Sequence, residues 1–297
     1  MSKTDKINLP PTTLKQLSRR SDFKGLTQLA GHLAVLLMAG LGMHFLQGSI
    51  WFVPLLLIYS VLLIFLFAPL HECIHFTAFN TRWIDNAVAA VIGFLLIIPY
   101  QYFRVFHYAH HRYTQDPERD PELVEQGAKK VSQLVYLSGL STWWAGIRSL
   151  ARHAQGEVSE SCIETRQHKA IIKEARVHVA LYLLLFLLSL MVSSAVLWWY
   201  WILPALLGQP WLRLFLRAEH SGCDFSADML ENSRTTYTTP LLNFLAWNMP
   251  YHAEHHYLAS IPFHALPALH AYTGQQVKFK GDGYYRVNRE IGFEFSH

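Results

Sequence analysis

Four apolar segments of this chain are long enough to cross a lipid bilayer, and they limit its fold more than any other feature. A crossing α-helix needs about 17–25 apolar residues, and it satisfies its own backbone hydrogen bonds inside the hydrocarbon layer. Hydrophobic residues make up 52% of the sequence, a share typical of integral membrane proteins. We therefore predict an all-α integral membrane fold with four transmembrane helices, at residues 30–46, 50–69, 179–198 and 200–216.

Charged residues indicate how these spans are oriented. Basic residues precede the first span, and eleven Lys or Arg residues lie between Arg104 and Arg176. The short turns within each pair of spans, near 47–50 and 198–201, carry no charge. By the positive-inside rule, both termini and the central segment face the cytosol. Residues 1–29 should then form a cytosolic tail, and residues 104–177 and 218–297 a cytosolic helical cap.

Eight histidines gather in three short clusters. The spacing within a cluster is i,i+4 or i,i+3,i+4, which places its members on one face of a helix, one turn apart. Neutral imidazole is the commonest metal ligand, so a face of stacked imidazoles offers several ligands to one ion. The clusters are His71 and His75; His107, His110 and His111; and His252, His255 and His256. Because the second and third clusters lie in the predicted cap, we expect the functional site on the cytosolic side.

A fifth apolar run, residues 87–99, lies between the first and second clusters. If it crossed the membrane once, those two clusters would lie on opposite sides and could not share a metal site. Two full crossings need about 40 residues, but only 31 residues lie between His75 and His107. We therefore expect a re-entrant or interfacial segment here, with an isolated core helix as the alternative.

The first cluster reads His71-Glu72-Cys73-Ile74-His75, which is a literal H-E-x-x-H pattern. In zinc metalloproteases the two histidines of this pattern bind zinc and the glutamate is the general base. An intramembrane zinc protease is therefore a genuine alternative. A catalytic zinc ion takes three protein ligands, so that interpretation leaves five clustered histidines unexplained.

A ninth candidate ligand, His220, follows the fourth span, where the chain returns to the cytosol. Nine imidazoles exceed the coordination of one six-coordinate ion, so two metal ions are the economical interpretation. All-nitrogen sites suit zinc, copper, iron or nickel. A carboxylate-rich di-iron bundle is disfavoured, because it needs two Glu-x-x-His motifs and the sequence has only the one from Glu72 to His75.

The three clusters and their flanks resemble the histidine boxes of the membrane fatty acid desaturase superfamily. The flanks read His-His-Arg-Tyr-Thr-Gln-Asp-Pro-Glu-Arg-Asp-Pro-Glu-Leu at 110–123 and Asn-Met-Pro-Tyr-His-Ala-Glu-His-His at 248–256. The resemblance covers roughly residues 30–270 and implies a single desaturase-like domain over residues 30–297. It also implies a non-haem centre of two iron ions, held by the eight box histidines and His220, that activates O2 and attacks an unactivated C–H bond.

The activity that the resemblance implies is desaturation of a lipid or fatty-acyl substrate entering from the bilayer. Hydroxylases, carotenoid oxygenases and alkene-forming decarboxylases share these boxes and remain alternatives. The sequence has three cysteines and no Gly-x-Gly-x-x-Gly, so electrons should come from an external donor of the ferredoxin, rubredoxin or cytochrome b5 type. It has no basic block of the nucleic-acid-binding type. We expect a multi-pass protein of the bacterial inner membrane with a cytosolic active site.

One position departs from the resemblance. In acyl-CoA desaturases of this superfamily an Asn four residues before the lone histidine helps to complete a metal's coordination shell, and here that position is Leu216. Asn248 is the candidate to serve instead, directly or through a water molecule.

Carboxylates near the boxes are candidates to accept the second N–H of a metal-bound imidazole and so to orient it. They are Glu72, Glu219, Glu254, Asp116 and Asp120. Other histidines carry no such expectation, and His153, His168 and His297 are predicted to lie at the surface.

Overall fold

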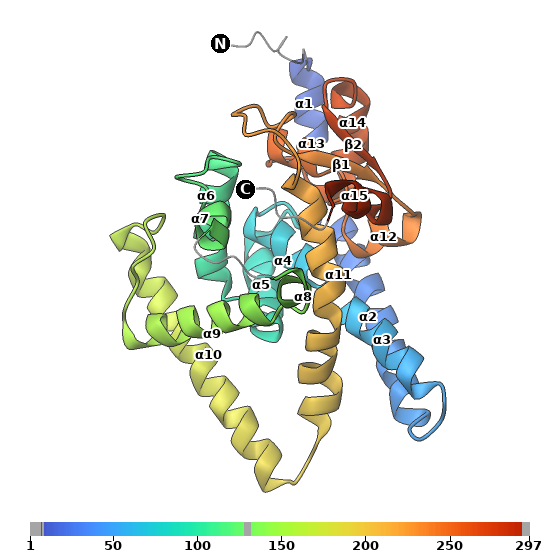
Figure 1. Cartoon of the computed structure of the whole chain (residues 1–297), viewed down its shortest axis with the longest axis vertical. Helices are drawn as coiled ribbons and strands as arrows, with labels where there is room; N and C mark the ends of the chain where they lie inside the picture. The colour runs from blue at the N-terminus through green and yellow to red at the C-terminus, as the bar shows by residue number, and fades with distance from the viewer. Residues whose placement is uncertain (1–6, 8, 128–131, 293–297) are drawn as a thin grey trace.

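The computed structural model describes residues 7, 9–127 and 132–292, and most of these residues are helical (Figure 1). The short elements of residues 221–292 gather at one end of the molecule, here called the cap, whereas the longest helices extend away from it (Figure 1). In chain order the helices are α1 (Pro11–Leu17), α2 (Asp22–Phe45), α3 (Phe52–Ile64), α4 (Phe67–Ile74), α5 (Arg82–Leu96), α6 (Tyr100–Tyr113), α7 (Pro121–Gly127), α8 (Gln133–Leu137), α9 (Leu140–Gln155), α10 (Thr165–Met191), α11 (Leu203–His220), α12 (Pro240–Leu245), α13 (His252–Tyr257), α14 (Leu266–Thr273) and α15 (Tyr284–Ile291). A π-helical turn, Trp198–Ile202, precedes α11, and a 3-10 turn, Phe263–Ala265, precedes α14.

The structure is mostly helical, as predicted, and the chain adds one small sheet that was not predicted. Strand β1 (Arg234–Tyr237) pairs in parallel with β2 (Phe279–Asp282), with Arg234 opposite Phe279. Each strand has only four residues, and the partners lie 45 positions apart in the sequence. Such short strands leave no hydrophobic alternation to detect in advance. The sheet lies among α12 to α15 in the cap (Figure 1).

Two segments of the described chain are long and apolar enough to cross a membrane. They are α2 and the segment Phe52–Ile74, which contains α3 and α4. The first two predicted spans, 30–46 and 50–69, largely overlap these two segments. A third crossing would be added only if α5 and α6, which meet at an angle of 97°, formed one bent span. The predicted spans 179–198 and 200–216 are not among these segments: the first runs past the end of α10 at Met191, and the second coincides with the π-helical turn and α11.

The apolar run 87–99 occupies the second half of α5 and the turn that follows it. Helix α5 ends because Ile97 adopts a left-handed conformation, with φ of 60°, and because Pro99 cannot continue the ladder of helical hydrogen bonds. The sharp bend returns α6 towards α4, which it contacts. The first and second histidine clusters therefore lie together without a further pair of crossings, as either a re-entrant segment or a broken span would allow.

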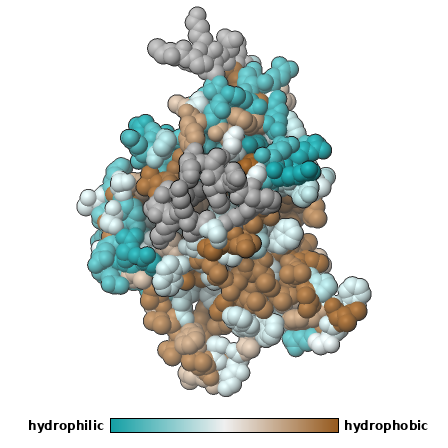
Figure 2. Space-filling model, in the orientation of Figure 1, coloured by the Kyte–Doolittle hydropathy of each residue, from teal (hydrophilic) through white to brown (hydrophobic). Residues whose placement is uncertain are grey.

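One hydrophobic core links the long helices to the cap. It runs from Ala39 in α2 to Leu269 in α14, and it buries Leu70 and Ile74 of α4 completely. Outside this core, many large apolar side chains are exposed, and they cover most of the lower part of the view in Figure 2. Hydrophilic residues gather in the upper part, over the cap, and along the left edge of the view. The histidine clusters lie where the buried core meets this cap.

Candidate metal centre

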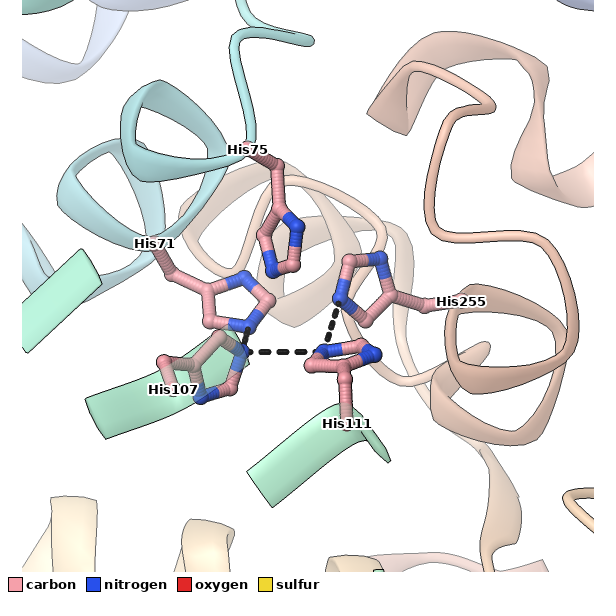
Figure 3. A group of neighbouring side chains, drawn as sticks. All are labelled: His71, His75, His107, His111 and His255. Carbon is pink, nitrogen blue, oxygen red and sulfur yellow. Dashed lines mark hydrogen bonds between the residues drawn. The ribbon is translucent and has the colours of Figure 1, made fainter. Parts of the chain in front are cut away.

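Eight of the nine candidate histidines come together from four helices, α4, α6, α11 and α13, and form two groups. The five-histidine group draws on the end of α4, on α6 and on α13, and its rings converge on a common point (Figure 3). The three-histidine group draws on α6, α11 and α13. Within each group one nitrogen of every ring lies within 4.8 Å of those of the others. The members are His71, His75, His107, His111 and His255 for the first group, and His110, His220 and His256 for the second.

In the five-histidine group, Nε2 atoms face one another at short range. The Nε2 atom of His107 lies 2.7 Å from that of His71 and 3.0 Å from that of His111. The Nε2 atom of His255 lies 3.1 Å from that of His111. The Nε2 atom of His75 is buried and has no partner among the described residues. Five imidazole nitrogens thus surround one small volume.

The three-histidine group is extended by a fourth imidazole. The Nε2 atom of His220 lies 3.2 Å from that of His110 and 2.9 Å from that of His252. The Nε2 atom of His256 is buried without a partner in the described part of the chain. His252 is therefore adjacent to this group, although it does not meet the 4.8 Å criterion with all of its members.

Two pairs of consecutive histidines, His110-His111 and His255-His256, connect the groups. On α6, His107 and His111 are one turn apart and share the first group, whereas His110 points to the second. On α13, His255 belongs to the first group and His256 to the second. Consecutive helical residues point about 100° apart, so each pair divides between two sites. The rings of His111 and His256 stack across the boundary, with centroids 4.0 Å apart.

The imidazole nitrogens of these two groups are suited to binding transition-metal ions. Burial lowers the pKa of His252, His255 and His256 well below the ordinary histidine value, so these rings are neutral and can offer a lone pair. Two ligand nitrogens bound at about 2.1 Å and at right angles lie about 3.0 Å apart, close to the 2.7–3.2 Å separations found here. Buried nitrogens with no protein partner are costly, and a bound cation would satisfy them.

Each ring of the second group is hydrogen-bonded from behind through Nδ1. The Nδ1 atom of His110 lies 2.9 Å from Oδ1 of Asp120. For the adjacent His252, Nδ1 lies 3.2 Å from Oε1 of Glu219, without hydrogen-bond geometry to any described residue. Two further contacts are the Asn232 carbonyl with His220 and the Thr114 hydroxyl with His256, both at 3.1 Å. Such contacts select the tautomer and turn Nε2 towards the metal position.

Of the five carboxylates expected in this supporting role, two contact a box histidine and three do not. Asp120 and Glu219 make the contacts just described. Asp116 instead accepts the backbone N–H of Glu118 and pairs with Arg119, because its side chain closes the turn after α6.

The other two carboxylates fasten the box helices rather than the imidazoles. Glu72 accepts hydrogen bonds from the Thr77 hydroxyl at 2.7 Å and the Phe263 N–H at 3.2 Å. Glu254 lies 2.5 Å from both the Thr235 hydroxyl and Nδ1 of His270. Both residues point away from the histidines that flank them in sequence, since neighbouring helical residues face different directions.

Sequence reasoning missed three contributors. Thr114 and Asn232 orient box histidines, and Glu122 lies with Oε2 at 3.9 Å from Nδ1 of His110. Glu122 stands in the same Asp-Pro-Glu-Leu segment as Asp120, so proximity to the second box was an available signal. Asn232 uses its backbone carbonyl, which every residue type has, so no residue identity could have marked it.

A cavity of about 50 Å³ lies between the two groups. Histidines from both groups line it, together with two carboxylates and several apolar side chains. Leu216 is on its wall, whereas Asn248 is not; the Asn248 amide instead donates to the Phe263 carbonyl at 3.1 Å. The lining residues are Phe67, Ala68, His71, His107, His110, Glu122, Phe215, Leu216, Glu219, His220, Met249 and His252.

Comparison with known proteins agrees with this arrangement. The fatty acid desaturase family model matches residues 48–288, which include all nine histidines. The chain belongs to the fatty acid desaturase family. Membership confirms the resemblance noted in the sequence and implies an iron-dependent oxidoreductase of lipid metabolism. It also argues against the zinc protease alternative, because the H-E-x-x-H segment lies inside the matched region.

Two relatives of this desaturase-family chain are lipid desaturases by name. An sn-1 oleoyl-lipid 12-desaturase of Arthrospira platensis is 23% identical over 251 residues, which cover 77% of this chain and 70% of that protein. An sn-1 oleoyl-lipid 12-desaturase of a Picosynechococcus strain is 27% identical over 81 residues, covering 25% of this chain and 23% of that protein. At these identities the similarity indicates the family and not the substrate.

Proposed function

We propose that this protein is an O2-dependent membrane desaturase that removes two hydrogens from the fatty-acyl chain of a lipid. The observation that carries the proposal is the pair of adjoining imidazole groups, with members of both lining one small cavity. All-nitrogen ligand sets suit iron and do not suit Mg²⁺ or Ca²⁺, which prefer oxygen ligands. The names of the two relatives support a lipid substrate.

In this proposal each group holds one iron ion. The five-histidine group would bind one ion, and His110, His220, His252 and His256 would bind the other. Bound iron would supply the oxygen-dependent oxidation of an unactivated C–H bond. Asp120 and the Asn232 carbonyl would keep the Nδ1–H of His110 and His220 engaged, so that each Nε2 remains available to the ion.

The cavity wall would position the substrate and exclude water. Phe67, Phe215 and Met249 offer an apolar surface suited to an alkyl chain. Leu216 makes the wall beside His220 apolar too, so a water or ligand at that position would depend on Glu122 or Glu219, the carboxylates among the described lining residues.

Electrons must enter from another protein. Removing two hydrogens from the substrate releases two electrons, whereas reduction of O2 to two water molecules consumes four electrons. An external donor of the ferredoxin, rubredoxin or cytochrome b5 type would supply the other two. Of the three cysteines, Cys73 and Cys223 are buried apart from any cysteine cluster, so no iron–sulfur centre of the chain's own is expected.

We also propose four membrane spans, with both termini and the metal centre on the cytosolic side of a bacterial inner membrane. The C-terminal half of α10 supports a third span, because Leu183, Phe186 and Met191 are more than half exposed. Such an apolar surface is unfavourable in water. Helix α11 supports a fourth span, since it packs along α3. The continuous core supports a single domain.

Metal analysis together with product analysis tests this function. Purified protein should contain two irons per chain and, with O2 and an electron donor, convert a lipid-linked acyl chain to a product lighter by two hydrogens. His255→Ala should lose iron and turnover, whereas His168→Ala, outside both groups, should retain them. One zinc and no iron would refute the proposed centre. A product that gains oxygen would indicate a hydroxylase, and loss of CO2 a decarboxylase.

A further inference from the structure

Helix α9 presents three chemically different faces. One face packs against the protein: Leu150 and His153 are 5% and 1% exposed, and Trp143 contacts the hydrophobic core. These residues are spaced i, i+7 and i+10, which places them along one side of a helix. An ordinary surface helix would expose only polar residues on its remaining sides.

The second face of α9 is apolar and exposed. Leu140, Trp144 and Ile147 follow one another at i, i+4 and i+7, and they are 57%, 61% and 42% exposed. Ala151, also exposed, continues the same stripe one turn later. No described part of the chain covers these side chains, although together they form the kind of continuous apolar surface that a soluble face avoids.

The third face is polar and lies opposite the buried one. It carries Ser141, Arg148 and Arg152, and Arg152 pairs with Glu160 at 2.6 Å. A helix with separate protein-facing, apolar and basic faces matches the composition of helices that lie in a membrane surface.

The contacts of α9 place it beside the point at which α10 changes from a charged to an apolar helix. At its C-terminal end, the Ala154 carbonyl accepts a hydrogen bond from Nε of Arg176 at 2.9 Å. Arg176 is the last charged residue of α10, and the apolar half of that helix begins at Val177. At the other end, Gly139 lies against α11: an added Cβ there would be 2.6 Å from the Gln209 side chain. Helix α9 therefore runs across from α10 to α11 (Figure 1).

We propose that α9 lies in the surface of the cytosolic leaflet, with Leu140, Trp144, Ile147 and Ala151 in contact with lipid acyl chains. This inference rests on the proposed spans of α10 and α11. Trp is favoured at the boundary of a bilayer, and Arg148 beside the stripe suits lipid phosphates. Because the ring of His153 packs 5.0 Å from that of Tyr102 on α6, the bilayer contact braces the helix that carries the second histidine box.

Two matched alanines test the proposal. Ala151 lies in the stripe, and Ala145 lies about 120° away towards the polar face; both are exposed. Each would be changed to cysteine and spin-labelled in a Cys162→Ser background, in which the remaining Cys73 and Cys223 are buried. In vesicles of phosphatidylcholine and phosphatidylglycerol, electron paramagnetic resonance would compare collision with O2, which concentrates in the bilayer, and with a water-soluble nickel chelate.

The label at 151 should collide several-fold more with O2 than with nickel, and the label at 145 should show the reverse. A nickel-accessible label at 151 would overturn the proposal. A label at 151 shielded from both reagents, with spin–spin broadening, would also overturn it, because the stripe would then contact a second copy of the chain. A third label, at Leu183→Cys on α10, distinguishes failure of the proposed α9 placement from failure of the proposed α10 span. If that label is in lipid and the one at 151 is in water, only the placement of α9 fails; if both are in water, the proposed span fails too.

Discussion

The carboxylate of Glu174 accepts a hydrogen bond from the backbone N–H of Tyr100 at 2.9 Å, and a second, also at 2.9 Å, from that of Gln101. These two N–H groups open α6, whose own N-cap residue, Pro99, makes no side-chain cap. A residue on α10 thus satisfies the first turn of the helix that carries three box histidines. This helix-capping contact therefore connects α10, just before the proposed third span, to the helix that carries the second histidine box.

Glu174→Ala should lower the free energy of unfolding by about 1 kcal/mol, the usual cost of losing a helix cap. Glu174→Gln keeps one acceptor oxygen and should cost less. Thermal unfolding of the purified proteins would measure both, with Glu157→Ala, which removes an exposed carboxylate, as the control. Equal unfolding temperatures for Glu174→Ala and Glu157→Ala would show that the cap contributes nothing.

Asp120→Asn should weaken metal binding at the second group and leave the first group occupied. Loss of the carboxylate behind a ligand histidine costs about 10–100-fold in metal affinity, and Asp120 contacts only His110 among the box histidines described here. Iron titration of the protein should change from two tight sites to one tight and one weak site. Asp116→Asn, on the same turn but paired with Arg119, should keep two tight sites.

Ala68→Val should fill part of the cavity between the groups. Two added methyl groups would occupy much of its 50 Å³, so turnover should fall while both irons remain bound. Overpacking should also cost about 1–3 kcal/mol of stability. Ala39→Val is the control, since Ala39 is also buried in the core but does not line the cavity. Undiminished turnover in Ala68→Val, with the iron retained, would show that the substrate does not use this space.

His153 was expected at the surface, but the structure buries it to 1% exposure. Its Nε2 atom lies 3.1 Å from Oε1 of Glu160, and its ring packs against Tyr102. His153→Ala should therefore lower the free energy of unfolding by about 1–3 kcal/mol, because it removes a partner from a half-buried carboxylate. The comparison is with His168→Ala, which removes no such contact among the described residues and should be close to neutral in the same unfolding assay.

Acidification should lower the folding stability that the Glu160 carboxylate contributes between α9 and α10. Burial alone raises the pKa of Glu160, but hydrogen bonds from His153 and Arg152 outweigh it and lower the pKa from 4.5 to about 2. A carboxyl whose pKa is lower in the folded state stabilises that state above its unfolded pKa and loses the effect as pH falls. Wild-type stability should thus decline between pH 4.5 and pH 2. Glu160→Gln should be less stable at neutral pH and lack this part of the decline, as circular dichroism against pH would measure.

Some of the site could be predicted because it depends on a single helix. His107 and His111 are one turn apart on α6 and necessarily share a face, so their common group follows from spacing alone. His220 was identified by its place just after a predicted span. The positions of Thr114 and the Asn232 carbonyl could not be anticipated, since each meets its histidine only after distant segments pack together.

By itself the sequence determined the ligand type, the number of candidate imidazoles and the apolar segments that call for a membrane. These depend on composition and on the fixed rise and rotation of a helix. Only the tertiary structure decided that His255 joins His111 while His256 joins His110, that Asp120 supports the site while Asp116 does not, and that Leu216 rather than Asn248 lines the cavity. The physical reason is that periodicity specifies the direction of a side chain about its own helix axis. The distance between side chains on different helices depends on how the core packs, and no local pattern encodes it.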